Sequence, residues 1–333
     1  MRLIIPMAGR GTRLRPHTHV TPKPLLPVAG KMIVERIIET FHKTLDRTID
    51  EIVFVLGDFG DEVKRELTEM SERQGATARF YTQDVAKGTA HAVQCASDSL
   101  EGEVIIVFAD TLFDTDTKVT VGDADSVIWL KEVEDPSRFG VAVHEGDTIT
   151  DFVEKPSEPI SNLAIIGVYY FKEGEALKKE IQYLLDNNVT GHGEEYQLTD
   201  ALDRLLKDGK RFKKATVDEW LDCGTLPAWV ETSHHIIEKE QQEIDKSKFP
   251  GCTFKEPVYI GKNVTIKDSI LGPNVTVNDG ATIAGCTLSD TIVLDNATVK
   301  NSQLKKSTVG EHAKVKGING TVHAGNHSVV EHE

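Results

Sequence analysis

The spacing of aliphatic residues near the C-terminus limits the possible folds of this chain more than any other feature. From Val258 to Val315 of the 333-residue sequence, aliphatic residues recur every five or six positions, with Gly, Asn or Asp between many of them. Short strands of this period predict a β-solenoid, in which each coil covers the apolar face of the next. A meander of hairpins would alternate with period two instead. The recurring residues are Ile260, Ile266, Leu271, Val277, Ile283, Leu288, Val293, Val299, Leu304, Val309 and Val315.

The preceding part of the sequence alternates between apolar strands and amphipathic helices. We expect strands at residues 2–6, 51–56, 103–110, 125–132, 140–145, 162–171 and 211–217, and helices at 31–46, 61–74, 88–100, 175–188, 195–208 and 226–243. Such alternation is typical of an α/β fold with a mostly parallel sheet covered on both faces. The turn formers of FPGCTF mark a boundary after Lys248. We therefore predict an α/β domain over residues 1–245, a linker over 246–256 and the solenoid over 257–333.

Composition and charge exclude several classes of protein. The formal net charge is −15, which argues against nonspecific nucleic-acid binding because such binding needs broad cationic faces. No apolar run approaches the ~20 residues needed to cross a bilayer, so we expect no membrane partner. The four cysteines are scattered without a CxxC pair, and the N-terminus resembles a strand rather than a signal peptide. These features favour reduced thiols and a cytoplasmic location.

The first 34 residues contain six Lys or Arg and no Asp or Glu, in contrast to the acidic chain as a whole. The stretch AGRGTRLRP lacks the GK[ST] ending of a Walker A loop, and Leu14 stands where a dinucleotide fingerprint needs its third glycine. Gly9 and Gly11 follow the first strand and would let backbone N–H groups approach phosphate. Arg13 adds a permanent forked cation, and Lys23, between two prolines, adds a point charge. The segment therefore suits a small polyanion held in a cleft.

Two aspartates follow apolar strands. Asp110 ends VIIVFAD, and Asp222 lies in EWLDCGT. Ligands of open α/β sheets bind at the carboxyl ends of strands, and two carboxylates could share one Mg²⁺ with phosphate oxygens. The spacing of the two aspartates in the sequence leaves open whether they meet.

These motifs together resemble the sugar-1-phosphate nucleotidyltransferases, also called nucleotide-sugar pyrophosphorylases. The resemblance rests on GRGTRLRP, TPKPLLPVAGKMIVER, QDVAKGTAHAV, FAD, FGVAV, VEKP, IIGVYYF and WLDCGT, which occur in the family's order and are followed by the repeats. It implies a Rossmann-like catalytic domain with a mixed, mostly parallel sheet over residues 1–245 and a left-handed parallel β-helix after the linker.

The resemblance also implies a role for each site residue. Gly9, Gly11 and Arg13 would hold the triphosphate, Lys23 the reacting phosphates and Lys155 the sugar phosphate, while Gln83 and Gly88 would read the nucleobase edge. The full assignment is nucleotide binding by Ala8, Gly9, Gly11, Thr12, Gln83, Gly88 and Thr89, catalysis by Arg13, Lys23 and Lys155, sugar binding by Gly140, Glu154 and Gly167, and Mg²⁺ binding by Asp110 and Asp222.

The expected reaction joins a nucleoside triphosphate to a sugar 1-phosphate and releases pyrophosphate. The loop AGRGT is one residue shorter than the AGGSGT of thymidylyltransferases and is more similar to the loop of uridylyltransferases. Thr89 and Thr111 also depart from common family residues. UTP or dTTP with glucose 1-phosphate or a related hexose 1-phosphate is the favoured pair. The alternatives are a mannose-1-phosphate guanylyltransferase and a catalytically silent regulatory subunit that binds sugar nucleotides.

The repeats raise a separate question, because hexapeptide β-helices also build acyltransferases. Such sites need a catalytic His and an excursion from the coil. Here the repeats run almost without insertion, and His312 and His323 lie at the far end. We therefore expect the repeats to serve homo-oligomerisation or regulation.

Overall fold

The computed structural model describes residues 1–9, 11–45, 47–115, 124–158 and 160–332. The chain forms two compact units: the first comprises Met1–Gly9 and Glu35–Trp220, and the second comprises Arg10–Val34 and Leu221–Glu333. The second unit thus combines the basic segment near the start of the sequence with the C-terminal repeats, a grouping that the predicted linker at 246–256 does not anticipate.

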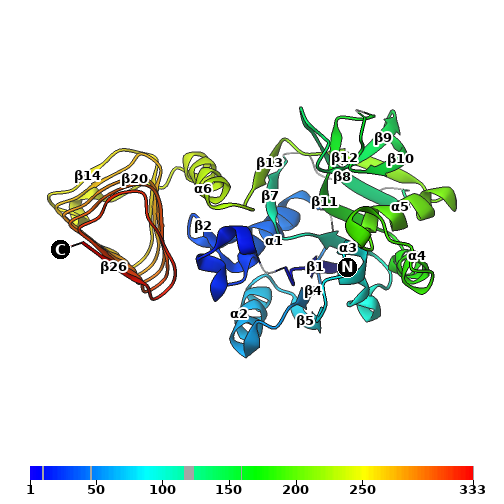
Figure 1. The fold of residues 1–333 in the computed structure, drawn as a ribbon, viewed down its shortest axis with the longest axis horizontal. Coiled ribbons are helices and arrows are strands. Elements are labelled where there is room, and N and C mark those ends of the chain that lie inside the picture. The colour runs from blue at the N-terminus through cyan, green and yellow to red at the C-terminus, as the bar shows by residue number, and fades with distance from the viewer. Residues whose placement is uncertain (10, 46, 116–123, 159, 333) are drawn as a thin grey trace. The chain divides into compact units, whose positions relative to one another are not determined.

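A nine-stranded sheet runs through the first unit in the order β5–β4–β1–β6–β11–β8–β12–β10–β9 (Figure 1). The strands are β1 (Arg2–Pro6), β4 (Glu51–Leu56), β5 (Thr77–Thr82), β6 (Val104–Val107), β8 (Ser126–Glu132), β9 (Gly140–Glu145), β10 (Thr148–Glu154), β11 (Leu163–Phe171) and β12 (Phe212–Thr216). The predicted α/β class is confirmed. β5 and β10 were not expected from the sequence, because both alternate between exposed and less exposed residues instead of forming apolar runs.

The sheet is mixed. β5, β4, β1 and β6 pair in parallel, as do β8 and β12. β11 is antiparallel to β6 and β8, and β10 is antiparallel to β9 and β12. Parallel pairing is continuous from β5 to β6 and recurs between β8 and β12, so it does not predominate in the sheet as expected. Only Gly146 and Asp147 separate β9 from β10, and so short a connection can join only antiparallel neighbours.

Helices α3, α4 and α5 share one hydrophobic core with the sheet. Val93 of α3, Ile181 of α4 and Leu202 of α5 are fully buried in the cluster that contains Ile4 and Ile106. α3 is shorter than predicted, because a separate 3₁₀ turn at Ser97–Ser99 follows it. The helix bounds are α1 (Ile33–Thr44), α2 (Gly60–Arg73), α3 (Thr89–Gln94), α4 (Gly174–Asp186), α5 (Leu198–Lys207) and α6 (Leu226–Glu240). The short strands outside the large sheet are β2 (Pro27–Val28), β3 (Lys31–Met32), β7 (Thr111–Asp114) and β13 (Glu219–Asp222).

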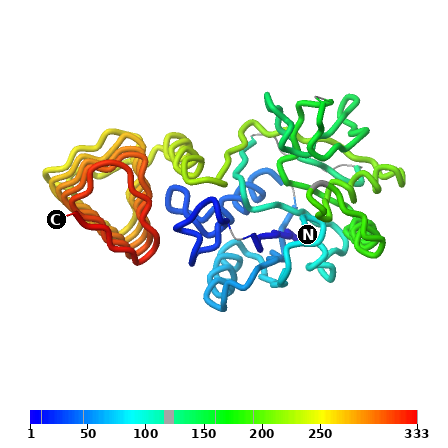
Figure 2. Tube along the Cα trace, in the orientation of Figure 1, coloured from blue at the N-terminus to red at the C-terminus, as the bar shows by residue number. Residues whose placement is uncertain are grey.

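The C-terminal repeats form a stack of short parallel strands, named here the C-terminal stack (Thr253–Glu331). Figure 2 shows its backbone winding as a three-sided coil. Successive coils are 17, 16 and 15 residues apart at the pairs Val258–Val275, Thr291–Ser307 and Thr308–His323, so each side takes five or six residues, as the period predicts. The parallel pairing is consistent with a β-helix. The strands are β14 (Thr253–Phe254), β15 (Val258–Ile260), β16 (Thr265–Lys267), β17 (Ile270–Leu271), β18 (Val275–Val277), β19 (Thr282–Ala284), β20 (Thr287–Val293), β21 (Thr298–Lys300), β22 (Gln303–Val309), β23 (Lys314–Lys316), β24 (Asn319–Gly320), β25 (His323–Ala324) and β26 (Val329–Glu331).

Besides the C-terminal stack, the second unit contains the opening segment (residues 11–34) and α6. The opening segment contains three single 3₁₀ turns, at Thr12–Leu14, His17–His19 and Lys23–Leu25, and ends in the antiparallel pair β2–β3. Trp229 of α6 is fully buried, and its indole N–H donates to the carbonyl oxygen of Pro27 at 2.9 Å. Among the described residues, no helix is both long enough and apolar enough to span a membrane.

Candidate active site

Gly11 lies where the turns of the opening segment approach one another closely. Its φ is +55°, in the left-handed region that favours glycine. A Cβ built on Gly11 would lie 3.1 Å from both the Lys23 Cβ and the Thr18 Cγ2, so the side chains on either side leave almost no space. The Gly11 carbonyl accepts a hydrogen bond from the Thr18 hydroxyl at 2.7 Å. The glycine at this position thus allows the first two turns to fold against each other.

Arg13 and Asp222 both lie close to Gly224, within the second unit. The Gly224 N–H donates to the Asp222 Oδ1 at 2.6 Å. A Cβ built on Gly224 would lie 2.8 Å from that oxygen and 3.4 Å from an Arg13 Nη. Both side chains are exposed, while Gly224 is buried. The structure therefore brings together a predicted phosphate-binding cation and a predicted metal-binding carboxylate.

In the first unit, the Glu154 carboxylate lies close to residues of two other elements, Gly140 of β9 and Thr199 of α5. Gly140 pairs with Glu154 across β9 and β10, and a Cβ on Gly140 would lie 2.9 Å from the Glu154 Oε2. The Thr199 hydroxyl of α5 donates to the same oxygen at 2.8 Å. Lys155 Nζ is 3.9 Å from the Glu154 Oε1. Two residues of the predicted sugar site, Gly140 and Glu154, are thus adjacent to the predicted catalytic lysine.

Gly167 interrupts the pairing of β11. The register of β11 against β8 shifts between Ile165 and Tyr169, and Gly167 has φ +80°, a β-bulge of the kind often found beside active sites. The Gly167 carbonyl accepts from the Phe108 N–H at 3.0 Å, two residues before Asp110. Burial raises the pKa of the Tyr169 phenol, and the carboxylates of Glu154 and Asp110 raise it further. Asp110 and Glu154 therefore both lie close enough to Tyr169 to influence its titration.

Gln83 has a fixed partner. Its Nε2 lies 3.0 Å from the His91 Nδ1. An amide nitrogen only donates, so Nδ1 must accept and the ring proton must sit on Nε2. Burial, followed by the charge of Lys87, lowers the pKa of His91, which favours this neutral ring. The contact orients the Gln83 amide.

Gly88 and Thr89 connect the start of α3 to the loop before α5. A Cβ on Gly88 would lie 2.4 Å from the Tyr196 carbonyl oxygen, and φ is +108°. The Thr89 hydroxyl accepts from the Leu198 N–H at 2.9 Å and donates to the Gln197 side chain at 3.4 Å. Both residues were predicted to contact the nucleotide, and both have structural contacts that account for their presence.

The remaining predicted residues are divided between the units. Ala8 and Gly9 follow β1 in the first unit, and Thr12 begins the first turn of the second. A Cβ on Gly9 would meet no described atom within 4 Å, so packing alone does not require glycine there. Lys23 is buried in the third turn.

The two predicted metal-binding residues also belong to different units, Asp110 to the first and Asp222 to the second. Their sharing of one Mg²⁺ remains a prediction. Both carboxylates are exposed, and no cluster of three or more His, Cys, Asp or Glu in the described ranges is arranged to hold a metal ion. Exposed carboxylates fit Mg²⁺, which keeps several waters and binds largely through substrate phosphates.

Sequence reasoning missed Thr199 and Asp200 at the start of α5. Thr199 orients Glu154, and burial raises the pKa of Asp200, with Glu154 and Asp203 raising it further. The stretch QLTD has the composition of many helix starts, so it carries no signal of a site without the fold.

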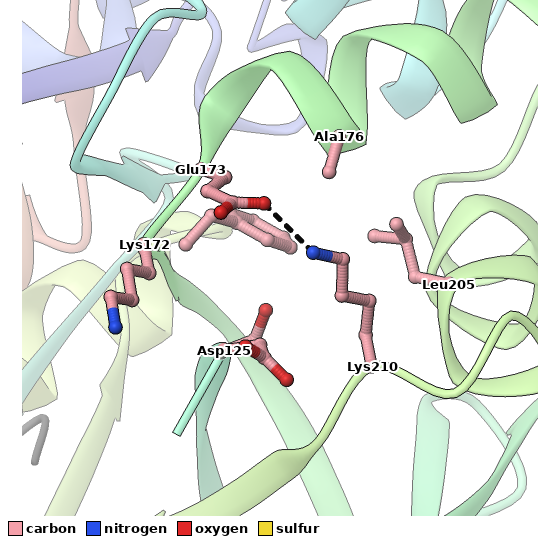
Figure 3. A pocket seen from close by; sticks show the side chains of 8 residues that line it. Asp125, Lys172, Glu173, Ala176, Leu205 and Lys210 are labelled. Atoms are coloured by element: carbon pink, nitrogen blue, oxygen red, sulfur yellow. Dashed lines mark hydrogen bonds and ion pairs between the residues drawn. The ribbon is translucent and has the colours of Figure 1, made fainter. Parts of the chain in front are cut away.

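A small cavity elsewhere in the first unit does not coincide with any predicted site residue (Figure 3). It has room for about one water molecule. Its mouth carries an ion pair between Lys210 and Glu173 at 2.8 Å. The lining residues are Asp125, Ser126, Phe171, Lys172, Glu173, Ala176, Leu205 and Lys210. We interpret the cavity as a packing defect beside a surface ion pair.

The α/β sheet, the glycines that follow β1 and the bulge of β11 suit a nucleotide-processing class of fold. The sequence matches the Nucleotidyl transferase family over residues 3–239, and the chain belongs to that family. The family resemblance seen in the motifs is thereby confirmed.

Three curated relatives show the range of similar proteins. The chain is 28% identical to the low-salt glycan biosynthesis nucleotidyltransferase Agl11 of Haloferax volcanii, with 95% of this chain and 94% of that protein covered. It is 25% identical to a glucose-1-phosphate thymidylyltransferase of Streptomyces griseus, covering 97% and 96%. It is 30% identical to the bifunctional protein GlmU of Methanococcus aeolicus over 81% of this chain, which spans only 60% of that longer protein.

Solved structures agree on the fold. A UDP-glucose pyrophosphorylase complexed with UDP-glucose superposes with a TM-score of 0.59 at 23% identity, covering 72% of this chain and 98% of that one. A structure described as a putative glucose-1-phosphate thymidylyltransferase from Bacillus anthracis superposes with a TM-score of 0.56 at 26% identity, covering 70% and 93%.

Proposed function

We propose that the protein transfers a nucleotidyl group from a nucleoside triphosphate to a sugar 1-phosphate and releases pyrophosphate. Membership of the family supports this class of reaction. The observation that carries the proposal to this chain is the position of Arg13 beside Asp222 at Gly224. It pairs a phosphate-binding cation with a carboxylate that suits a phosphate-bound metal.

In the proposed reaction, an oxygen of the sugar 1-phosphate attacks the α-phosphorus of the triphosphate. The new O–P bond forms as the bond to the β-phosphate oxygen breaks, and pyrophosphate leaves in line. The attacking phosphate is already anionic, so no strong general base is needed. The barrier lies in bringing two polyanions together, and positioned cations lower it. Arg13 and Lys23 would provide this charge.

The sugar would bind in the first unit at Glu154. Thr199 orients the Glu154 carboxylate and Gly140 leaves room for it, and its oxygens can accept hydrogen bonds from sugar hydroxyls. Lys155 is adjacent and would pair with the sugar phosphate. Asp110 and Asp222 would hold Mg²⁺, which when bound supplies positive charge to the phosphates.

The nucleobase is proposed to be uracil or thymine, recognised by Gln83. The two bases share the same hydrogen-bonding edge and differ by one methyl group, so an oriented amide at Gln83 could bind either base. Discrimination between UTP and dTTP would depend on that methyl group and on the ribose 2′-hydroxyl. The proposed sugar is glucose 1-phosphate, which the names of two similar proteins include.

In the deciding experiment, the full chain is incubated with Mg²⁺ and each pairing of five nucleoside triphosphates with several sugar 1-phosphates. Pyrophosphate release is then measured. Release that depends on one sugar 1-phosphate supports the proposal, and GTP with mannose 1-phosphate as the best pair would identify a guanylyltransferase instead. Absence of release with every pair, despite binding of a nucleotide sugar, would indicate a silent regulatory subunit.

We further propose that the C-terminal stack is a left-handed β-helix that supports a homo-oligomer in the cytoplasm. Sedimentation analysis of the full chain tests the oligomer. Transfer of an acyl group from acyl-coenzyme A to an amino sugar would instead show that the stack carries a second activity.

A further inference from the structure

One face of the C-terminal stack is buried although its side chains point away from the stack's own core. Val275 and Val277 point into the core, so Thr276 between them points outward. Strand pairing aligns Thr276 with Ile292 and Thr308 in successive coils. Thr276, Ile292 and Thr308 are nonetheless at most 2% exposed. Other parts of the second unit must therefore cover this column.

The opening segment contacts both ends of the column. At the first coil, a Cβ built on Gly30 would overlap the Tyr259 hydroxyl, so only glycine fits there. At the last coils, His17 is fully buried and its Nε2 lies 2.7 Å from the Thr308 Oγ1. The same hydroxyl oxygen lies 2.9 Å from the His323 Nδ1.

Two further contacts join the opening segment to the last coil of the C-terminal stack. A Cβ on Gly325 would lie 3.0 Å from the Pro16 Cβ, so the last coil approaches the segment closely. The Asn326 Nδ2 donates to the Thr21 Oγ1 at 3.2 Å. The His17 ring also packs edge-on against Trp229, with centroids 5.2 Å apart.

The peptide chain and two hydrogen bonds connect His17 to the turn that carries Arg13. His17 and Thr18 belong to the second turn, and the Thr18 hydroxyl donates to the Gly11 carbonyl. That carbonyl also accepts from the Leu14 N–H at 2.9 Å, which closes the turn that carries Arg13. A shift of the His17 ring would therefore be transmitted through Thr18 and Gly11.

We propose that Thr308 and His17 are positioning residues, through which the last coils of the C-terminal stack hold the Arg13 turn in its reactive geometry. This inference rests on the proposed function. Thr308 has one hydroxyl proton, so it donates to one histidine and accepts from the other. The ring that accepts the Thr308 proton must be neutral, and burial lowers the pKa of both His17 and His323, which favours neutral rings.

The test compares Thr308→Val with two matched variants of the full chain. Valine keeps the shape of threonine but removes the hydroxyl, whereas Thr308→Ser keeps it. Thr276→Val makes the same change in the same column two coils away, where among the described residues the Thr276 hydroxyl has no hydrogen-bond partner. We expect kcat to fall about 10- to 100-fold in Thr308→Val, as a misplaced charge-stabilising group would cause. The KM for the sugar 1-phosphate should change by less than about threefold.

The two controls should retain nearly full kcat, because Thr308→Ser restores the hydrogen bonds and Thr276→Val removes none. Hydrogen exchange measured by mass spectrometry gives a second readout, in which peptides covering residues 11–21 should exchange faster in Thr308→Val alone. Wild-type kcat and unchanged exchange in Thr308→Val would overturn the inference, as would an equal loss of kcat in Thr276→Val. An inactive wild-type chain would refute the proposed function, and the exchange comparison would still test the coupling.

Discussion

The buried His17 makes the stability of the second unit depend on pH. Its ring is fully buried between Trp229 and Thr308, and burial, with a smaller effect of His323, lowers its pKa from 6.5 to about 4. We therefore expect a specific loss of stability in mild acid, which His17→Gln should remove. Glutamine cannot titrate, yet its amide can still donate to Thr308.

The sign and size of this pH dependence follow from the number of protons that the folded and unfolded chains bind. Between pH 6.5 and about 4, the unfolded chain binds a proton at His17 that the folded chain does not bind, so the free energy of unfolding falls as the pH falls. Each pKa unit corresponds to 1.36 kcal/mol. The full loss is about 3 kcal/mol once the pH lies below both values, and about 2 kcal/mol is lost between pH 7.5 and pH 5.

The assay is urea denaturation at several pH values, monitored by the fluorescence of Trp229 in a chain whose Trp129 and Trp220 are replaced by Phe. The quantity of interest is the difference in unfolding free energy between wild type and His17→Gln. Between pH 7.5 and pH 5, the unfolding free energy of wild type should fall by about 2 kcal/mol more than that of His17→Gln. Parallel pH profiles for the two proteins would refute the assignment of a lowered pKa to His17.

Three further predictions concern the site. Arg13→Ala should lower kcat by about 10²–10³, the scale for losing one positioned charge-stabilising donor; near-wild-type turnover would contradict the role of Arg13. Glu154→Gln should raise the KM for the sugar 1-phosphate about tenfold through weaker hydrogen bonds, with the KM for the triphosphate as the internal control. Gly88→Ala should destabilise the first unit by about 2 kcal/mol or more, because its Cβ would lie 2.4 Å from the Tyr196 carbonyl oxygen. If the urea unfolding curve, followed by Trp129 fluorescence, is unchanged in Gly88→Ala, the loop has adapted to the added methyl group.

Several features of the fold were predictable because they depend on neighbours in the sequence. The bounds of β1, β4 and β9 match the expected strands, and the five- to six-residue period anticipated the coils of the C-terminal stack. The apolar runs did not predict which strands of the mixed sheet pair antiparallel, because a buried strand has the same composition whether its neighbour is parallel or antiparallel.

The candidate site was predictable only in part. The motifs indicated Glu154 and Asp222 but not the residues that contact and orient them. Thr199 reaches Glu154 across 45 positions of the sequence, and Gly224 is explained only by the atoms of Asp222 and Arg13 around it.

By itself, the sequence determined the α/β class, the repeated coils and the residue types suited to binding phosphate, because periodicity and local motifs are properties of adjacent residues. Only the tertiary structure decided that the basic segment packs against the C-terminal stack. His17 and Thr308 are 291 positions apart, and a hydrogen bond over such a distance leaves no pattern in a single sequence, since it depends on how the whole unit folds.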